Sequence, residues 1–245
     1  MQEIIEFPAV ILDVKKQKIV ARFHHYIKPE VHPELTKFCT ELTGIQQETV
    51  DAGIPITKAL RLLHEFLLEN GVLGTNYAFL SCGDFDSKAL KREAEYKGFF
   101  VPSYLKRWIN IKRVFPLHLF LPSEKDKAHK YEVNNVYRHK HAVIDGMPHM
   151  LKTVGLELEG RHHSGIDDTI NIARIVIECL KVGFKFHEGH VAALEYETGD
   201  RSQKAEKWPF HWNQGVKEAL EKSEDLQALE QSKALEVVLM MSECM

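Results

Sequence analysis

Strand-like and helix-like segments alternate along the first 187 residues, and this order limits the fold more than any other feature of the sequence. Two runs rich in β-branched and aromatic residues, 3–12 and 19–27, flank a polar segment, as in a β-hairpin. Shorter strand-length runs follow at 76–82 and 109–114. Helical candidates lie at 33–40, 46–50, 57–70, 87–97, 102–108, 147–154 and 168–181. This order predicts a three-layer α/β domain with a mixed central sheet flanked by helices.

Composition narrows the classes of protein that remain possible. The 245 residues are 44% hydrophobic and 27% charged, which excludes a chain that is disordered throughout. The net charge is −3, so no overall basic field attracts nucleic acid and any such binding must be local. The cysteines Cys39, Cys82, Cys179 and Cys244 are scattered and form no C-x-x-C pair, which favours reduced thiols. No apolar run is long enough to span a membrane, so we expect no membrane partner and a cytoplasmic or nuclear location.

Charge also predicts a boundary near residue 187. Residues 188–245 are acidic, with 12 Asp or Glu against 6 Lys or Arg. Residues 216–238 have a helix-compatible composition with irregular apolar spacing, so we expect a partly helical or disordered tail. A protein partner could bind to this tail. Within the domain of residues 1–187, residues of about 117–145 show no regular spacing of hydrophobic residues. We interpret this stretch as a polar insertion, either a functional loop or a disordered segment.

The densest group of polar residues precedes the last predicted helix. Asp167 and Asp168 lie in its first turn, where a carboxylate can cap the helix or bind a metal. His163 lies five residues before Asp168 in a Ser-Gly loop, and an imidazole is a natural base for the proton of a water molecule.

A second acidic group follows the predicted strand 76–82. Asp84 and Asp86 lie where the strand ends and the next helix begins, a position at which α/β proteins often assemble sites. Taken alone, either residue is equally a turn or cap aspartate. Downstream, eight Lys or Arg residues face two acids over residues 88–113, interleaved with aromatic residues. That mixture suits single-stranded nucleic acid, and it also suits a solvated helical face with its aromatics in the core.

Five segments together resemble one family, the DEDD-h 3′-to-5′ exonucleases. Within it, the sequence is similar to the subgroup of the 3′ histone-mRNA exonuclease and its relative named for enhanced RNA interference. The matching segments are 2–8 (QEIIEFP), 41–45 (ELTGI), 82–86 (CGDFD), 108–110 (WIN) and 160–173 (GRHHSGIDDTINIA), which follow the family's order. The resemblance covers about residues 2–186 and leaves out the insertion and the tail.

The resemblance implies an RNase H-like fold and a metal-dependent 3′-to-5′ exoribonuclease. Two Mg²⁺ or Mn²⁺ ions would assist hydrolysis of the terminal phosphodiester of single-stranded RNA 3′ ends or short overhangs. It implies that Asp86 and Asp168 are metal ligands and that His163 is the general base. It implies further that Phe38 and Phe85 sandwich the terminal base, flanked by Leu42 and Ile45, and that Asp84, Asp167 and His162 are structural neighbours.

One element of the family's pattern is missing from the printed sequence. The family's Asp-x-Glu strand, which supplies two of four carboxylates, lies upstream of the segment matched by residues 2–8. Glu3 and Glu6 match residues that accompany this strand and do not replace it. We therefore expect a sheet that lacks its first strand, with a gap beside the opening hairpin, and weakened metal binding. Three explanations stay open: a start at an internal Met, a natural short form that binds RNA without catalysis, or a strand lent by another chain.

Overall fold

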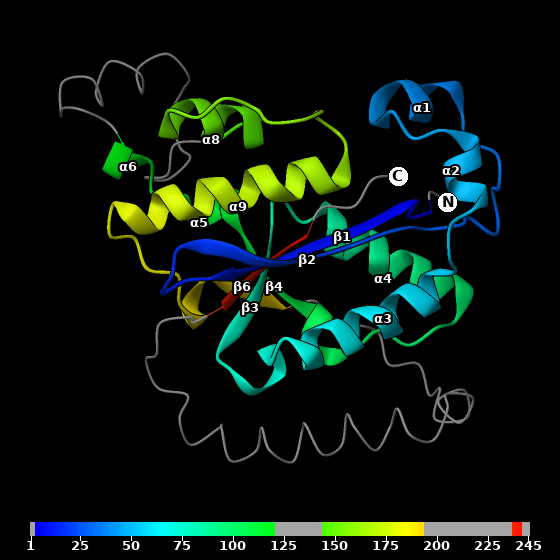
Figure 1. Ribbon diagram of the computed structural model, residues 1–245, viewed down its shortest axis with the longest axis horizontal. Helices are drawn as coiled ribbons and strands as arrows, with labels where there is room; N and C mark the ends of the chain where they lie inside the picture. The colour runs from blue at the N-terminus through cyan, green and yellow to red at the C-terminus, as the bar shows by residue number, and fades with distance from the viewer. Residues whose placement is uncertain (1–2, 121–143, 194–236, 242–245) are drawn as a thin grey trace, which may run out of the picture.

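A six-stranded mixed sheet forms the centre of the computed structural model (Figure 1). The structure describes residues 3–120, 144–193 and 237–241, without the side chains of Phe85, Ser87 and residues 237–241. The strands are β1 (Glu6–Asp13), β2 (Lys18–Tyr26), β3 (Tyr77–Ser81), β4 (Arg107–Asn110), β5 (Val191–Ala193) and β6 (Val237–Met241). Their order in the sheet is β2-β1-β6-β3-β4-β5.

The hairpin of β1 and β2 forms one side of the sheet, and β3 and β4 lie on the other side as a parallel pair. Strand β5 closes the far edge, antiparallel to β4. Between the two sides lies β6, antiparallel to β1 and parallel to β3. The predicted gap beside the hairpin is therefore not present: a segment of the same chain occupies it, which none of the three sequence-based explanations included.

Helices cover both faces of the sheet and give it the three predicted layers (Figure 1). Along β1, Ala9 and Ile11 belong to the core shared with α3 (Ile56–Glu69) and α4 (Phe85–Lys97). Val10 and Leu12 belong to the core shared with α8 (Met147–Val154) and α9 (Gly165–Lys181). Because successive side chains on a strand point to opposite faces, one buried strand supports both layers. In the described ranges, no helix is long and apolar enough to cross a membrane.

Smaller elements connect these layers. They are α1 (Lys37–Thr43), α2 (Gln47–Asp51), η1 (Val72–Gly74), η2 (Ser103–Lys106), α5 (Ile111–Val114), α6 (Leu117–Phe120) and η3 (Glu188–His190). The predicted helix at 147–154 has the bounds of α8. The predicted helix at 102–108 is wrong, because only η2 forms there and Trp108 is drawn into β4 by pairing with Phe79 of β3.

The segments on either side of the predicted boundary near residue 187 are only partly described. Strands β5 and β6 come from residues beyond it and both pair within the sheet, although the division into domain and tail stays a prediction. The predicted helix at 216–238 lies outside the described residues except for its last two positions, which begin β6. Most of the predicted insertion, residues 121–143, also lies outside them.

Helix α9 begins where a buried carboxylate from β1 meets its first turn. The Glu6 carboxylate accepts hydrogen bonds from the backbone N–H groups of Gly165 at 2.8 Å and Ile166 at 3.0 Å. It also contacts the His24 ring at 2.8 Å. A negative charge is favourable at a helix N-terminus, where the first N–H groups lack helical partners. The Glu6 carboxylate therefore fixes the start of α9 relative to β1.

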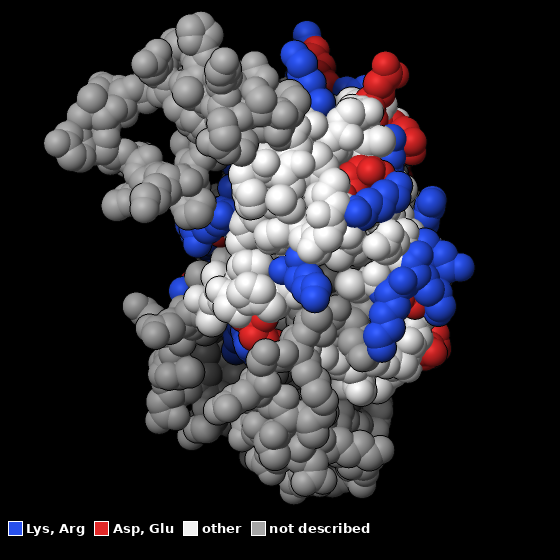
Figure 2. Space-filling model, turned by 90° about the vertical axis from the view of Figure 1, so that its left-hand side faces the viewer, with Lys and Arg blue, Asp and Glu red and all other residues white. Residues whose placement is uncertain are grey.

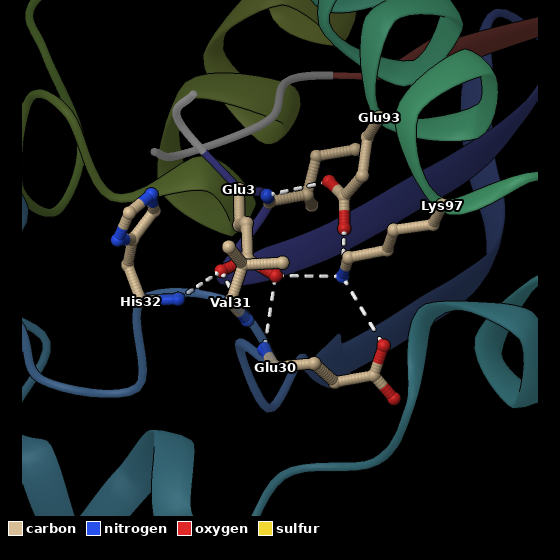
Figure 3. Close-up of polar contacts among 7 residues, drawn as sticks. Glu3, Glu30, Val31, His32, Glu93 and Lys97 are labelled. Carbon is tan, nitrogen blue, oxygen red and sulfur yellow. Dashed lines mark hydrogen bonds and ion pairs between the residues drawn. The ribbon is translucent and has the colours of Figure 1, made fainter.

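A second buried polar network fixes the N-terminal segment (Figure 3). The Lys97 ammonium, at the end of α4, lies 2.7 Å from the Glu3 carboxylate and 2.6 Å from that of Glu93. Glu3 accepts further hydrogen bonds from the backbone N–H groups of residues 30–32, and Glu93 accepts one from Ile4. Burial would raise the pKa of Glu3, but the hydrogen bonds from Lys97 and the backbone lower it to about 2.

Candidate active site

Asp168 in the first turn of α9 is the centre of the site. One carboxylate oxygen, Oδ2, accepts a hydrogen bond from the backbone N–H of His163 at 3.1 Å. The other, Oδ1, is buried and has no hydrogen-bond partner among the described residues. Burial, aided by the negative charges of Asp167 and Glu6 and opposed by the hydrogen bond from His163, raises the pKa of Asp168 to about 6. An unpaired buried carboxylate oxygen of this kind favours a cation as its partner.

His163 lies in the loop before α9 with a backbone φ of 71°, in the left-handed region that non-glycine residues seldom adopt. Its ring lies 3.9 Å from the ring of His162, centroid to centroid. One ligand atom from each of His162, His163 and Asp168 lies within 4.8 Å of the others. Backbone strain of this kind clusters at functional sites. Sequence reasoning treated His162 as a structural neighbour only, whereas the structure places its ring within the cluster.

Both histidines favour the neutral state. Burial lowers the pKa of His162. Burial and the neighbouring His162 lower the pKa of His163, although the Asp168 carboxylate opposes this. A neutral imidazole can accept a proton at pH 7, which is the chemistry expected of His163.

Asp86, the other metal ligand that the resemblance implies, lies on a different helix. It lies in the first turn of α4, directly after β3 and Cys82. Burial raises the pKa of the Cys82 thiol to about 12; the Lys112 ammonium opposes this, and the carboxylates of Asp86 and Asp168 add to it. The two carboxylates are therefore both near Cys82, although they are far apart in sequence. Their role as metal ligands, which the resemblance implies, stays a prediction.

Asp84 and Asp167, the neighbouring acids, are held by other groups. Asp84 accepts a hydrogen bond from the Asn110 side-chain amide at 2.8 Å and forms an ion pair with Arg113. Asp167 accepts one from the backbone N–H of Arg161 at 2.8 Å. These contacts position the ends of β4 and the loop before α9, as the structural role predicted for both residues requires.

The candidate base-binding residues lie on and after α1. Phe38 is 71% exposed, whereas Leu42 is half-buried. Ile45 is only 6% exposed and packs in a small core with Ile5 and Val50, so it supports the turn from beneath. The side chain of Phe85 lies outside the described residues, and its role as the second stacking aromatic stays a prediction.

Arg161 joins α1 to the histidine loop, a connection that sequence reasoning missed. Its guanidinium donates hydrogen bonds to the backbone carbonyl oxygens of Glu41 and Leu42. A Cβ at Gly44 would lie 2.9 Å from the guanidinium, so glycine is needed for this approach. No spacing rule links residues so far apart in sequence. Arg161 thereby links α1, which carries the exposed Phe38, to the loop that carries His163.

The carboxylates present suit one divalent cation. Hard cations prefer carboxylate oxygens, and Asp86 and Asp168 together carry about −2, which balances one such ion. Glu3 and Glu6 bind Lys97 and the start of α9, which agrees with the prediction that they do not replace the Asp-x-Glu pair. Strand β6, Val237–Met241, contributes no acidic residue from its sequence.

Charge on the surface is mixed. Figure 2 shows one face on which Lys and Arg side chains alternate with Asp and Glu around an uncharged area. This agrees with the net charge of −3, which gives no overall basic field. The basic stretch 88–113 presents Tyr96 at 63% and Phe100 at 42% exposure, with the Lys106 ammonium 5.6 Å from the Phe100 ring centroid. Some aromatics of this stretch are thus available to a ligand, whereas Trp108 is buried in the core.

Comparisons with known proteins agree with this geometry. The family model described as Exonuclease (RNase_T) matches residues 1–176. The chain is 37% identical over 190 residues to human ERI1 exoribonuclease 3, covering 76% of this chain and 50% of the relative. It is 35% identical over 199 residues to the 3′-5′ exonuclease Snipper of Drosophila melanogaster, covering 75% of this chain and 63% of the relative. The chain thus spans about half to two thirds of the length of these curated relatives.

Solved structures give the same result. The nuclease domain of 3′hExo, a DEDDh family member bound to rAMP, superposes with a TM-score of 0.61 at 30% identity over 79% of this chain and 86% of that one. A structure described as 3′-end specific recognition of histone mRNA stem-loop by 3′-exonuclease also gives 0.61, at 29% identity, over 79% and 81%. The three-layer fold is therefore the RNase H-like fold of these nucleases. With the family model matching residues 1–176, the chain belongs to the exonuclease (RNase_T) family.

Proposed function

We propose that the protein is a divalent-metal-dependent 3′-to-5′ exoribonuclease that releases nucleotides from RNA 3′ ends. The observation that carries this proposal is the cluster of His162, His163 and Asp168 at the start of α9, in which one buried carboxylate oxygen of Asp168 has no hydrogen-bond partner among the described residues. Its relatives are named as enzymes of this activity, and two solved relatives are described with rAMP and with an RNA stem-loop. Single-stranded 3′ ends and short overhangs are the substrates we propose for this chain.

Each residue has a role in this proposal. Asp86 and Asp168 hold Mg²⁺ or Mn²⁺, which would polarise the phosphodiester and stabilise the leaving oxygen. His163, neutral at pH 7, accepts the proton of the attacking water. The strained loop and the hydrogen bond to Asp168 hold the His163 backbone in place. Phe38 stacks on the terminal base, an interaction that tolerates every base.

The number of metal ions depends on negative charge. The two carboxylates balance one divalent ion, and a second ion would leave an excess of about +2 before the substrate phosphates arrive. We therefore propose that the first ion binds to the protein alone and that the second, which the resemblance implies, needs bound RNA.

The shortage of carboxylates also supports an alternative: a module that binds RNA ends without cutting them. The observation in its favour is β6, which lies between β1 and β3 and carries no acidic residue. Such a module would bind RNA with an affinity that falls steeply with salt.

The cytoplasmic or nuclear location stays a prediction, and the cysteines that the structure describes are free thiols.

One experiment separates the two functions. Mononucleotide release from 3′-labelled single-stranded RNA is measured with Mg²⁺ or Mn²⁺, alongside RNA binding, for the wild type, Asp168→Asn and His163→Ala. The nuclease proposal predicts metal-dependent release, lost in Asp168→Asn and reduced about 10²- to 10⁴-fold in His163→Ala, with RNA binding retained. Asp145→Asn, which changes an exposed carboxylate outside the cluster, serves as the control. Binding without release by the wild type would favour the alternative.

A further inference from the structure

We infer that the sheet contains a strand-acceptor site between β1 and β3 and that the protein fills it with its own C-terminal segment, Val237–Met241. This inference rests on backbone pairing and holds whether or not the proposed function is correct. The site is a slot for one extended segment, antiparallel to β1 and parallel to β3, and its occupant is a distant part of the same chain.

The pairing is continuous on both sides of the inserted segment. Residues 237–241 pair in order with residues 13–9 of β1, from Asp13 opposite Val237 to Ala9 opposite Met241. Residues 237–240 pair with residues 77–80 of β3, from Tyr77 opposite Val237 to Leu80 opposite Met240. Both neighbours use one register without a shift, which is typical of a central strand.

Removing this segment would break the sheet in its most buried part. Strand β1 is buried from Glu6 to Leu12, and β3 is buried from Ala78 to Ser81. Two strands separated by a missing strand lie about 9–10 Å apart, too far to pair with each other. Their facing N–H and C=O groups would then lack partners where water has little access, which costs free energy for each group. The buried edges therefore favour an extended occupant.

The hydrophobic core on each face of the sheet includes residues of both β1 and β3, the strands on either side of β6. On one face, Ile11 of β1 and Phe79 of β3 belong to one cluster, and on the other, Leu12 and Leu80 belong to a second. Helix α9 contacts both β1 and β6. If the slot were empty, the helices on both faces would lose the part of the sheet on which they pack. The sequence of the segment suits the position, because it is uncharged and begins with two β-branched valines.

The inserted strand also joins the two halves of the candidate site. Asp168 belongs to the half fixed to β1, because the Glu6 carboxylate of β1 binds the start of α9. Asp86 belongs to the other half, because α4 follows directly from β3. Strand β6 lies between β1 and β3 and so sets the separation of these halves. It is a positioning element that adds no carboxylate.

Hydrogen exchange on the full-length wild type tests the insertion directly. We expect the amides of 237–241 to exchange about 10³-fold or more slowly than in an unstructured peptide, and together with those of β1. Exchange of 237–241 at the rate of an unstructured peptide, while β1 stays protected, would overturn the inference.

A cysteine cross-link tests the register and identifies the donor chain. In a Cys244→Ser background, Asp13→Cys with Val237→Cys places two thiols at directly opposed positions. Asp13→Cys with Val238→Cys is the matched control, because a shift of one residue turns the side chain to the opposite face. We expect mild oxidation to give an intramolecular disulfide about tenfold or more efficiently in the first pair. Equal cross-linking of both pairs would contradict the register, and a disulfide-linked dimer would show that a second copy fills the slot.

Discussion

The Lys97 ammonium binds two carboxylates that have almost no access to water, so replacing it by methionine is a sensitive test of the fold (Figure 3). The side chains of Glu3 and Glu93 are 2% and 0% exposed, and that of Lys97 is 10% exposed. Methionine has a similar length, so Lys97→Met removes the charge and three donors while it keeps most of the packing. Two buried carboxylates then remain close together without a cation.

The cost follows from burial. Removing one partner of a buried ion pair typically costs about 3–5 kcal/mol, because the remaining charge is left without compensation. A domain has a total stability of about 5–15 kcal/mol, so this loss is a large part of it. At about 2–4 °C per kcal/mol for a chain of this size, Tm should fall by about 6–20 °C.

Urea unfolding at pH 7 measures this loss, with two variants as references. Lys91→Met on the same helix removes an i,i+4 pair with Glu95 whose side chains are 23% and 42% exposed, and it should cost less than about 1 kcal/mol. Adding Glu93→Gln to Lys97→Met should recover part of the stability, because it removes one of the two stranded charges. If Lys97→Met unfolds at the same urea concentration as Lys91→Met, the reasoning about buried charge is wrong.

Three further predictions concern pH, RNA and the loop before α9. Because the folded pKa of Glu3 is about 2, below its ordinary value of 4.5, Glu3 stabilises the fold above pH 4.5 and loses this contribution as pH falls toward 2. Urea unfolding should therefore show that the stabilities of the wild type and Glu3→Gln converge as the pH falls from about 5 to 2. Phe38→Ala should weaken RNA binding about fivefold or more without changing Tm, and Leu68→Ala, exposed on α3, should not alter binding in the same titration. Gly160→Ala should lower Tm, since its Cβ would lie 2.4 Å from the Asp167 carboxylate carbon at a φ of +73°; an unchanged Tm would refute this.

Local patterns in the sequence predicted most elements and the hairpin of β1 and β2, but not the pairing of strands that are distant in sequence. Helix α8 matches its predicted bounds, because Met147, Met150 and Leu151 form a buried face between glycines at either end. Strand β6 was missed: its first two residues ended a predicted helix, and five apolar residues alone do not distinguish a strand from a helix. Only pairing with two distant strands makes this segment extended, and no local rule contains that information.

In the candidate site, too, local patterns in the sequence predicted contacts between neighbouring residues but not between distant ones. His163 and Asp168 are close in sequence, so one loop and one helix turn predicted their contact. Asp86 and Asp168 lie far apart in sequence and both act electrostatically on the Cys82 thiol, a relation that no local pattern in the sequence contains. Their shared role as metal ligands is implied by the resemblance and stays a prediction. The hydrogen bonds from Arg161 to α1 had no sequence signal, because their acceptors are backbone carbonyl groups, which every residue has.

The place of β6 in the sheet has a consequence for biosynthesis. A ribosome that adds about 5–20 residues per second needs about 2–10 s to proceed from Ala193 to Met241. Throughout that interval β1 and β3 have been made but lack their shared neighbour, so two apolar edges are open to other chains. Completion of the sheet is therefore a late event in the synthesis of the domain, and the nascent protein is an expected client of chaperones that shield exposed strands.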